Sequence, residues 1–181
     1  IKDEFLLSTD ELDDPIFRVN YPEVITTPNF SIPPPKIKFL AEKHLFEVHL
    51  TKIFSPKQFW FQYGDESLSV LMGHMNEFYG ALPAGDLVVS DGNMKKGLVL
   101  AAKIFNVWHR AIIASEPMDN EEIFLFFVDF GMIDSMNWND VRYLLKRFAD
   151  EPVKALRGCL IGCKPKYFNN EWDKKSREAF F

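Results

Sequence analysis

The chain has 181 residues, of which 47% are hydrophobic and 26% are charged, so it can form a packed core and is not of the disordered class. Its net charge of −5 argues against nucleic-acid binding by bulk positive charge. No apolar run reaches the roughly 18 residues of a membrane helix, and no signal-peptide pattern opens the chain. Two cysteines are too few for a disulfide scaffold and fit a reducing compartment. The chain begins with Ile1, so we expect a piece of a longer protein.

The first 42 residues form an acidic and proline-rich segment. Six acidic residues and a single lysine lie in 1–14, a pattern typical of a solvated tail that could also attract a basic partner. Residues 15–40 contain six prolines, so we expect an extended stretch that wraps or links rather than a folded unit. The triplet 33–35 could instead be a polyproline ligand, although no docking motif flanks it.

A strand pair and a helix are expected next. The stretch HLFEVHLTKIFSPKQFWFQY (44–63) reads as two strands around the turn signal at 55–57. Alternation at Val48 and Leu50 predicts that the first strand is half-buried. The stretch ESLSVLMGHMNEFYGAL (66–82) has apolar residues at helical spacing, which predicts a helix whose methionine-rich stripe packs in the core.

A dense β region follows over residues 97–145. The stretches GLVLAAKIF, NVWHRAIIAS and EEIFLFFVDF predict three strands with short connections, typical of a small barrel or sandwich. Next, NDVRYLLKRF (139–148) has helical spacing, ALRGCLIGC (155–163) predicts one more strand, and 171–181 begins as a helix. Because strands precede and follow the β region, we expect the barrel to be inserted into a second unit.

In chain order these elements resemble an extended Tudor domain, a Tudor barrel inserted into a staphylococcal-nuclease-like fold. The resemblance rests on an ordered set of short stretches: FSPKQFWFQ, MNEFYG, GLVLAAKIF, VWHRA, FVDFG and VRYLLKRFADEPVKALRGCLIGCKP, with Trp172 after them. It covers roughly residues 43–181. It implies a mostly β fold with some α, in which a small β-barrel (95–145) sits within an OB-type α/β unit (43–90 and 148–181).

The resemblance implies peptide binding rather than catalysis, with no cofactor and no metal. Members of the family are scaffolds of cytoplasmic, perinuclear germ granules in the piRNA pathway, and the spacing is most similar to Tejas-like or Krimper-like single-Tudor scaffolds. The implied partner is the arginine-rich N-terminal peptide of a Piwi-type Argonaute protein. Methylated arginine binds in an aromatic cage, where each ring face contributes about 0.5–2 kcal/mol by cation–π attraction.

Carrying the family's cage onto this sequence gives an incomplete set. The first position falls on Ile104, or on Phe105 if one residue is skipped, and the second falls on His109. The two rings flanking the aspartate are Phe127 and Phe130, which simple strand alternation would place on opposite faces unless the turn at Gly131 bends the strand.

The last cage position, an asparagine in the family, is Met132, which cannot orient a guanidinium by hydrogen bonding. Phe127, Phe130 and Met132 could therefore be ordinary core residues. Alternatively, the groove binds an arginine peptide with weak or no dependence on methylation, or it is a dimethylarginine reader with an atypical cage.

Asp129 stands in an apolar stretch, FFVDFGM, where a lone carboxylate would be costly. In the family the aspartate of this motif and the arginine of the W-x-R-A motif resemble a paired element inside the barrel. Here these residues are Asp129 and Arg110, and a bidentate pair would satisfy both. We therefore expect a structural role for Asp129.

Other functions remain as alternatives. A nuclease would need clustered carboxylates and arginines, but only Glu47, Asp65 and Glu66 are offered, without an adjacent arginine. Zinc binding is not favoured, because Cys159 and Cys163 are expected to be packed strand thiols and the histidines lack ligand spacing. Single-stranded RNA binding has little support, because the small basic clusters at 95–96 and 146–147 lack interleaved aromatic residues. A scaffold or dimerisation module is also open.

Overall fold

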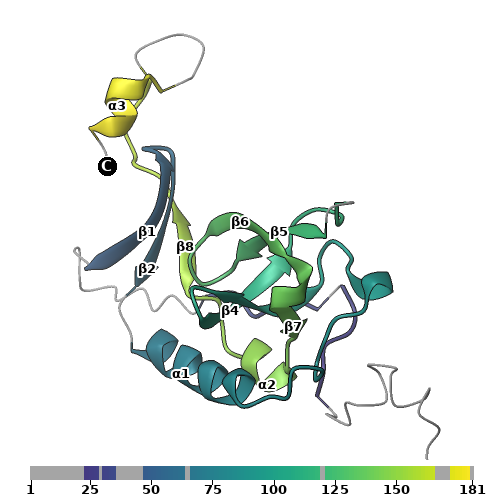
Figure 1. The fold of residues 1–181 in the computed structure, drawn as a ribbon. Coiled ribbons are helices and arrows are strands. Elements are labelled where there is room, and N and C mark those ends of the chain that lie inside the picture. Colours follow the sequence, from purple (N-terminus) through teal and green to yellow (C-terminus); the bar gives the residue numbers. More distant parts are fainter. Residues whose placement is uncertain are drawn as a thin grey trace, which may run out of the picture.

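The computed structural model describes residues 23–28, 30–35, 47–63, 66–118, 121–165 and 172–179. Within these residues the chain forms two antiparallel sheets and three short to medium helices, so the expected mostly β class is correct. Figure 1 shows the larger sheet curled into a barrel, with the longest helix beneath it and the smaller sheet at one side.

The larger sheet has five strands in the order β6-β5-β4-β3-β7. Their bounds are β3 Val99–Ile104, β4 Val107–Ile113, β5 Glu122–Phe127, β6 Met132–Asn137 and β7 Val141–Tyr143. The three strands predicted from the sequence are confirmed as β3, β4 and β5. Alternating residues on these strands fill the barrel, where Leu100, Ile113 and Leu125 are fully or almost fully buried.

The smaller sheet has three strands in the order β1-β2-β8, bounded by Val48–Ser55, Gln58–Tyr63 and Ala155–Gly158. The predicted turn at 55–57 joins β1 to β2. Strand β8 pairs with β2 although almost a hundred residues separate them, and all five barrel strands lie between them in the sequence. The barrel is thus inserted between the second and third strands of the smaller sheet.

The main helix, α1 (Ser67–Gly80), confirms the helix predicted over 66–82. It buries Leu71, Met75 and Tyr79 against the barrel, and the Tyr79 ring lies 5.1 Å from that of Trp108 on β4. The remaining helices are α2 (Lys146–Ala149) and α3 (Lys174–Glu178), with single 3₁₀ turns at Asp91–Asn93 and Trp138–Asp140.

Residues 23–28 and 30–35 pack on the barrel, so part of the proline-rich segment belongs to the same core. Ile25 and Ile32 are only 5% and 7% exposed. The Ile25 amide donates to Leu144 O at 3.0 Å, and the Val153 amide donates to Pro33 O at 3.0 Å. Residues 1–22 and 36–46, including the acidic head and Phe46, lie outside the described residues.

Three local predictions are wrong. Residues 139–148 were expected to be one helix but form the end of a 3₁₀ turn, strand β7 and the start of α2. The strand expected over 155–163 ends at Gly158, so the two cysteines are exposed rather than packed. Val48 and Leu50 are 42% and 41% exposed, because the face of β1 that carries them is turned away from the barrel.

Candidate functional site

The buried charged residues of the described chain form one ion pair at the side of the barrel. Arg110 and Asp129 are 1% and 3% exposed, and Arg110 Nε donates to Asp129 Oδ2 at 2.9 Å while Nη2 donates to Oδ1. The other guanidinium hydrogens reach the carbonyls of Phe148, Glu151 and Pro152. All five donors of Arg110 are therefore used, which offsets the cost of burying the charge.

Asp129 also lies in a turn that joins the barrel to the smaller sheet. Its Oδ1 accepts from the Lys154 amide at 3.0 Å, and its backbone carbonyl accepts from Gln62 Nε2 on β2 at 2.7 Å. One residue further along the turn, the Phe130 carbonyl accepts from Thr51 Oγ1 on β1 at 2.7 Å. The structure thus brings the expected pair together and gives it a second role as an anchor for the sheet.

Gly131 completes this turn because nothing larger fits. Its φ is +72°, and a Cβ placed on it would lie 2.0 Å from Cγ of Trp60 on β2. The amides of Phe130 and Gly131 both donate to the Phe127 carbonyl, at 3.1 and 2.8 Å, so the chain reverses tightly after β5. The turn therefore bends the strand, as the cage interpretation requires.

Four of the expected cage residues share the interior face at one end of the barrel. The register pairs Ala102 with His109 and Ala111 with Phe127, and it pairs Phe127 with Met132. Since alternate residues share a face, Ile104, His109, Phe127 and Met132 point to the same side. Ile104 and Met132 are partly buried and pack against the core.

His109 lies between the two phenylalanines of the motif. Its ring centroid is 6.0 Å from that of Phe127 and 5.3 Å from that of Phe130, and both contacts are edge-to-face. Phe130 is partly buried, whereas Phe127 is fully buried and belongs to the core. Phe127 therefore supports His109 from within, while Phe130 and His109 are nearer the surface.

The alternative cage residue, Phe105, does not line this end of the barrel. It stands at the tip of the β3–β4 hairpin, with φ of +47° and an exposure of 94%. Asn106 also has positive φ, so the two residues form the tight two-residue turn favoured between twisted strands. Of the two residues predicted for the first cage position, only Ile104 therefore faces this end of the barrel.

The electrostatics around His109 favour the neutral ring. Burial lowers the pKa of His109 below 6.5, and the nearby Asp129 carboxylate opposes this shift only in part. Its Nδ1 is buried and has no hydrogen-bond partner within the described part of the chain. A neutral imidazole does not repel an incoming cation, so the ring can serve as a wall for a guanidinium.

A separate cavity of about 710 Å³ lies between α1 and α2, away from the expected cage. Its lining includes Phe78 and Phe148, and the Arg147 guanidinium carbon lies 4.6 and 4.8 Å from the centroids of their rings. No motif in the sequence indicates this cavity, because its aromatic residues come from segments about seventy residues apart.

Within the described ranges, no group of three or more His, Cys, Asp or Glu side chains could hold a metal ion. Among the helices described here, none is long and apolar enough to cross a membrane. Of the carboxylates considered for nuclease chemistry, Glu47 and Glu66 are exposed, and Asp65 lies outside the described residues.

The inserted barrel, the strand pairing across it and the paired Arg110 and Asp129 define an extended Tudor fold. The family model of the Tudor domain matches residues 40–162, so the chain belongs to the Tudor domain family. It is 29% identical to the human Tudor and KH domain-containing protein over 158 residues, which are 84% of this chain and 27% of that protein. The chain thus spans about a quarter of the length of this relative.

Two groups of solved structures share the fold. The Drosophila melanogaster Papi extended Tudor domain has a TM-score of 0.68 at 24% identity, covering 75% of this chain and 72% of that one. The human TDRD1 extended Tudor domain, solved in complex with a symmetrically dimethylated peptide, has a TM-score of 0.64 at 20% identity, covering 74% and 66%. Neither comparison bears on the narrower resemblance to Tejas or Krimper, which stays a prediction.

Proposed function

We propose that residues 43–181 form a non-catalytic scaffold module that binds an arginine-containing segment of a Piwi-type partner, with little or no dependence on arginine methylation. The observation that carries the proposal is the edge-to-face contact between the rings of His109 and Phe130. This pair lies at the end of the barrel where Ile104 and Met132 are partly buried. The face of Phe130 and the neutral His109 ring offer a guanidinium two π-surfaces, each contributing on the order of 0.5–1 kcal/mol at a partly exposed site.

Weak methylation dependence follows from the walls that are not aromatic. Methylation makes the guanidinium larger and less hydrated, and this favours binding only where rings enclose it and exclude water. Ile104 supplies no quadrupole, Met132 supplies no amide acceptor, and Phe127 is fully buried. A pocket with these walls should hold the two forms of arginine about equally.

Structures of relatives support this class of partner. A Papi extended Tudor variant has been solved with an unmethylated Piwi N-terminal peptide and with the symmetrically dimethylated form of that peptide. Their identity to this chain is 24%, so they show that the fold can accept both forms, and the proposal for this chain rests on its own residues. A place in cytoplasmic germ granules is part of the same proposal.

Calorimetric titration tests the proposal directly. An arginine–glycine peptide would be titrated unmodified and symmetrically dimethylated, with a lysine–glycine peptide as the chemical control. We expect both arginine peptides to bind with affinities within about threefold of each other, and the lysine peptide to bind more weakly. A preference above about tenfold for the dimethylated peptide would establish a methylarginine reader instead.

Matched phenylalanine variants show whether the peptide uses the expected end of the barrel. Phe130→Ala should weaken binding, whereas Phe124→Ala, which removes a 39% exposed ring from β5, should leave it unchanged. Equal losses in the two variants, or none in Phe130→Ala, would place the peptide elsewhere.

A further inference from the structure

Two cations flank a tryptophan on the side of the smaller sheet that faces the barrel. Trp60 on β2 is paired with Lys52 on β1 and with Arg157 on β8. Directly opposed residues in antiparallel strands point to the same face. A register shift between Leu50 and Lys52 on β1 moves Lys52 from the outer face of Val48 and Leu50 to the face of Trp60, so the three side chains form one row across the sheet. We call Lys52, Trp60 and Arg157 the basic row.

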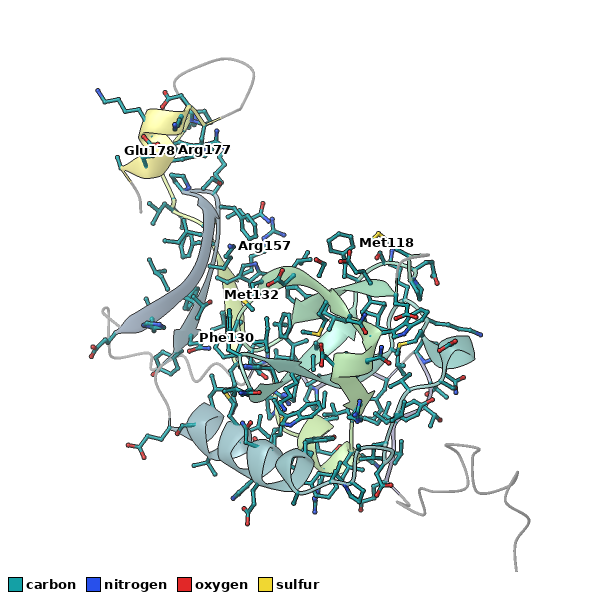
Figure 2. All side chains as sticks on the ribbon, in the orientation of Figure 1. Met118, Phe130, Met132, Arg157, Arg177 and Glu178 are labelled. Carbon is teal, nitrogen blue, oxygen red and sulfur yellow. The ribbon has the colours of Figure 1, made fainter. Side chains whose placement is uncertain are left out.

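The orientation of this row follows from its contacts. Trp60 lies against Gly131, and Gln62, two residues along the same face, donates to the Asp129 carbonyl. On the opposite face, Gly158 of β8 lies against Phe59 and Phe61. Arg157 therefore projects toward the barrel, and Figure 2 shows Phe130, Met132 and Arg157 following one another in the region between the smaller sheet and the barrel.

The cations of the basic row have capacity for a ligand. Arg157 is exposed, and no hydrogen bond or ion pair is found for its guanidinium within the described residues. Lys52 is exposed as well, with Nζ 5.8 Å from the centroid of the Phe54 ring. In Arg110, by contrast, all five donors are used inside the protein.

We propose that the basic row binds a carboxylate of the same peptide whose arginine docks at Phe130. This inference rests on the proposed function and adds a requirement to it: the partner segment is an arginine peptide with an Asp or Glu nearby. Arg157 offers a planar fork that matches a carboxylate, and Lys52 adds a second positive charge.

The spacing follows from strand geometry. Trp60 contacts the turn that carries Phe130, and Arg157 lies on the next strand, about 5 Å from Trp60. Two steps of this size, from the docked arginine to Trp60 and from Trp60 to Arg157, put the Arg157 guanidinium roughly 10 Å from the docked arginine. An extended peptide advances about 3.3 Å per residue. The carboxylate should therefore stand three or four residues from the docked arginine.

A peptide series tests this requirement. A neutral arginine–glycine peptide would be compared with versions carrying Glu three or four residues before or after the arginine, each matched by a Gln version. We expect Glu on one side to raise the affinity roughly two- to fivefold over Gln at about 0.01 M salt. The gain should shrink toward about 0.15 M salt, as screening of an exposed pair requires.

Three variants assign the gain to Arg157. Arg157→Gln should abolish it, whereas Arg177→Gln, an exposed arginine on α3 away from the barrel, should keep it. Arg157→Glu should reverse the preference, so that a Lys version of the peptide binds better than the Glu version. Since Arg157 is exposed, these changes should leave the melting temperature of the protein unaltered.

Each other outcome separates the two proposals. If the neutral peptide binds but Glu brings no gain, or if the gain survives in Arg157→Gln, the basic row is not a carboxylate site and the proposed function stands. If no arginine peptide binds, both proposals fall. If single-stranded RNA binds and Arg157→Gln abolishes that binding, the row serves a nucleic acid and the carboxylate assignment is wrong.

Discussion

The two sheets differ in how they are stabilised. The barrel encloses its own core, in which Leu98, Leu100 and Leu125 have no exposed surface. The smaller sheet leaves apolar side chains on its outer face, with Val48 42% and Tyr63 37% exposed. Its inner face is held to the barrel by two side-chain hydrogen bonds to the turn after β5 and by the contact of Trp60 with Gly131.

This difference separates folding from positioning. The barrel can be stable through hydrophobic burial, whereas the position of the smaller sheet depends on the turn that carries Phe130 and on the contact of the Trp60 ring with Phe126 of β5. A change in that turn should therefore disturb the sheet and the proposed peptide site together. Changes on the interior face near His109 should alter binding while leaving the sheet in place.

The largest effect is expected from breaking the buried pair on which both sheets depend. Arg110→Met and Asp129→Asn should each lower the free energy of unfolding by about 3–5 kcal/mol, because each leaves a buried partner unsatisfied. The double variant should lose less than the sum, since the second change removes the group that the first one stranded. Chemical denaturation of the four proteins measures this coupling, and strictly additive losses would contradict direct contact.

Gly131→Ala should disturb only the turn after β5, where the barrel contacts the smaller sheet. The new Cβ meets Trp60 at 2.0 Å in a backbone with φ of +72°, so we expect a loss of about 1–3 kcal/mol. Hydrogen exchange should show faster opening of β1 and β2 than of β3 and β4. Gly73→Ala on α1, where nothing lies within 4 Å, is the control and should stabilise the protein by about 0.5–1 kcal/mol. Uniform acceleration across both sheets would show that they unfold as one unit.

Completing the aromatic cage at the end of the barrel should give the protein a preference for the dimethylated peptide without any change to the smaller sheet. The combined change Ile104→Phe, His109→Tyr and Met132→Asn adds two aromatic walls and a hydrogen-bonding amide. Each ring could contribute about 0.5–1 kcal/mol, so the affinity for the dimethylated peptide should rise roughly tenfold. The affinity for the unmodified peptide should change less. Calorimetry with both peptides measures the two affinities. Equal gains for both would indicate non-specific binding to the added rings rather than a completed methylarginine cage.

A smaller effect is expected from acid. The pKa of His109 is lowered in the folded protein, mainly by burial. The contribution of the neutral ring to stability is therefore complete above about pH 6.5, the pKa of a free histidine, and is lost as the pH falls below it through the lower pKa of the folded state. Protonation should also weaken arginine binding by charge repulsion. Unfolding and titration between about pH 5 and 8 should show this trend, and His109→Gln should reduce it. His74→Gln, an exposed position on α1, should retain it.

No effect is expected in the last test, which asks whether the smaller sheet acts as a nuclease. We predict no cleavage of DNA or RNA with calcium or magnesium, because an arginine–carboxylate cluster is missing from the sequence around Glu47. Fluorescent oligonucleotide substrates provide the assay. Metal-dependent cleavage that survives repurification and disappears on changing Glu47 or Asp65 would refute the prediction.

Much of the local structure could be predicted from the sequence. The alternation in GLVLAAKIF and EEIFLFFVDF predicted β3 and β5, and the apolar spacing over 66–82 predicted α1. The prediction failed after Asp140, where helical spacing was outweighed by tertiary contacts. Leu144 and Leu145 are buried, and the chain then presents the carbonyls of Phe148, Glu151 and Pro152 to Arg110. Val141–Tyr143 pair with β3 instead, so their backbone groups are used in the barrel sheet rather than in a helix.

By itself, the sequence determined which residues could carry the chemistry: a carboxylate within an apolar run, an arginine on the preceding strand, and rings on either side of the carboxylate. Only the tertiary structure decided how they are used. The tight turn at Gly131 brought Phe130 back to His109, and burial withdrew Phe127 into the core. Pairing across nearly a hundred residues placed Arg157 beside Trp60. Alternation within a strand sets the face of a side chain, but contacts between distant strands depend on how the whole chain packs.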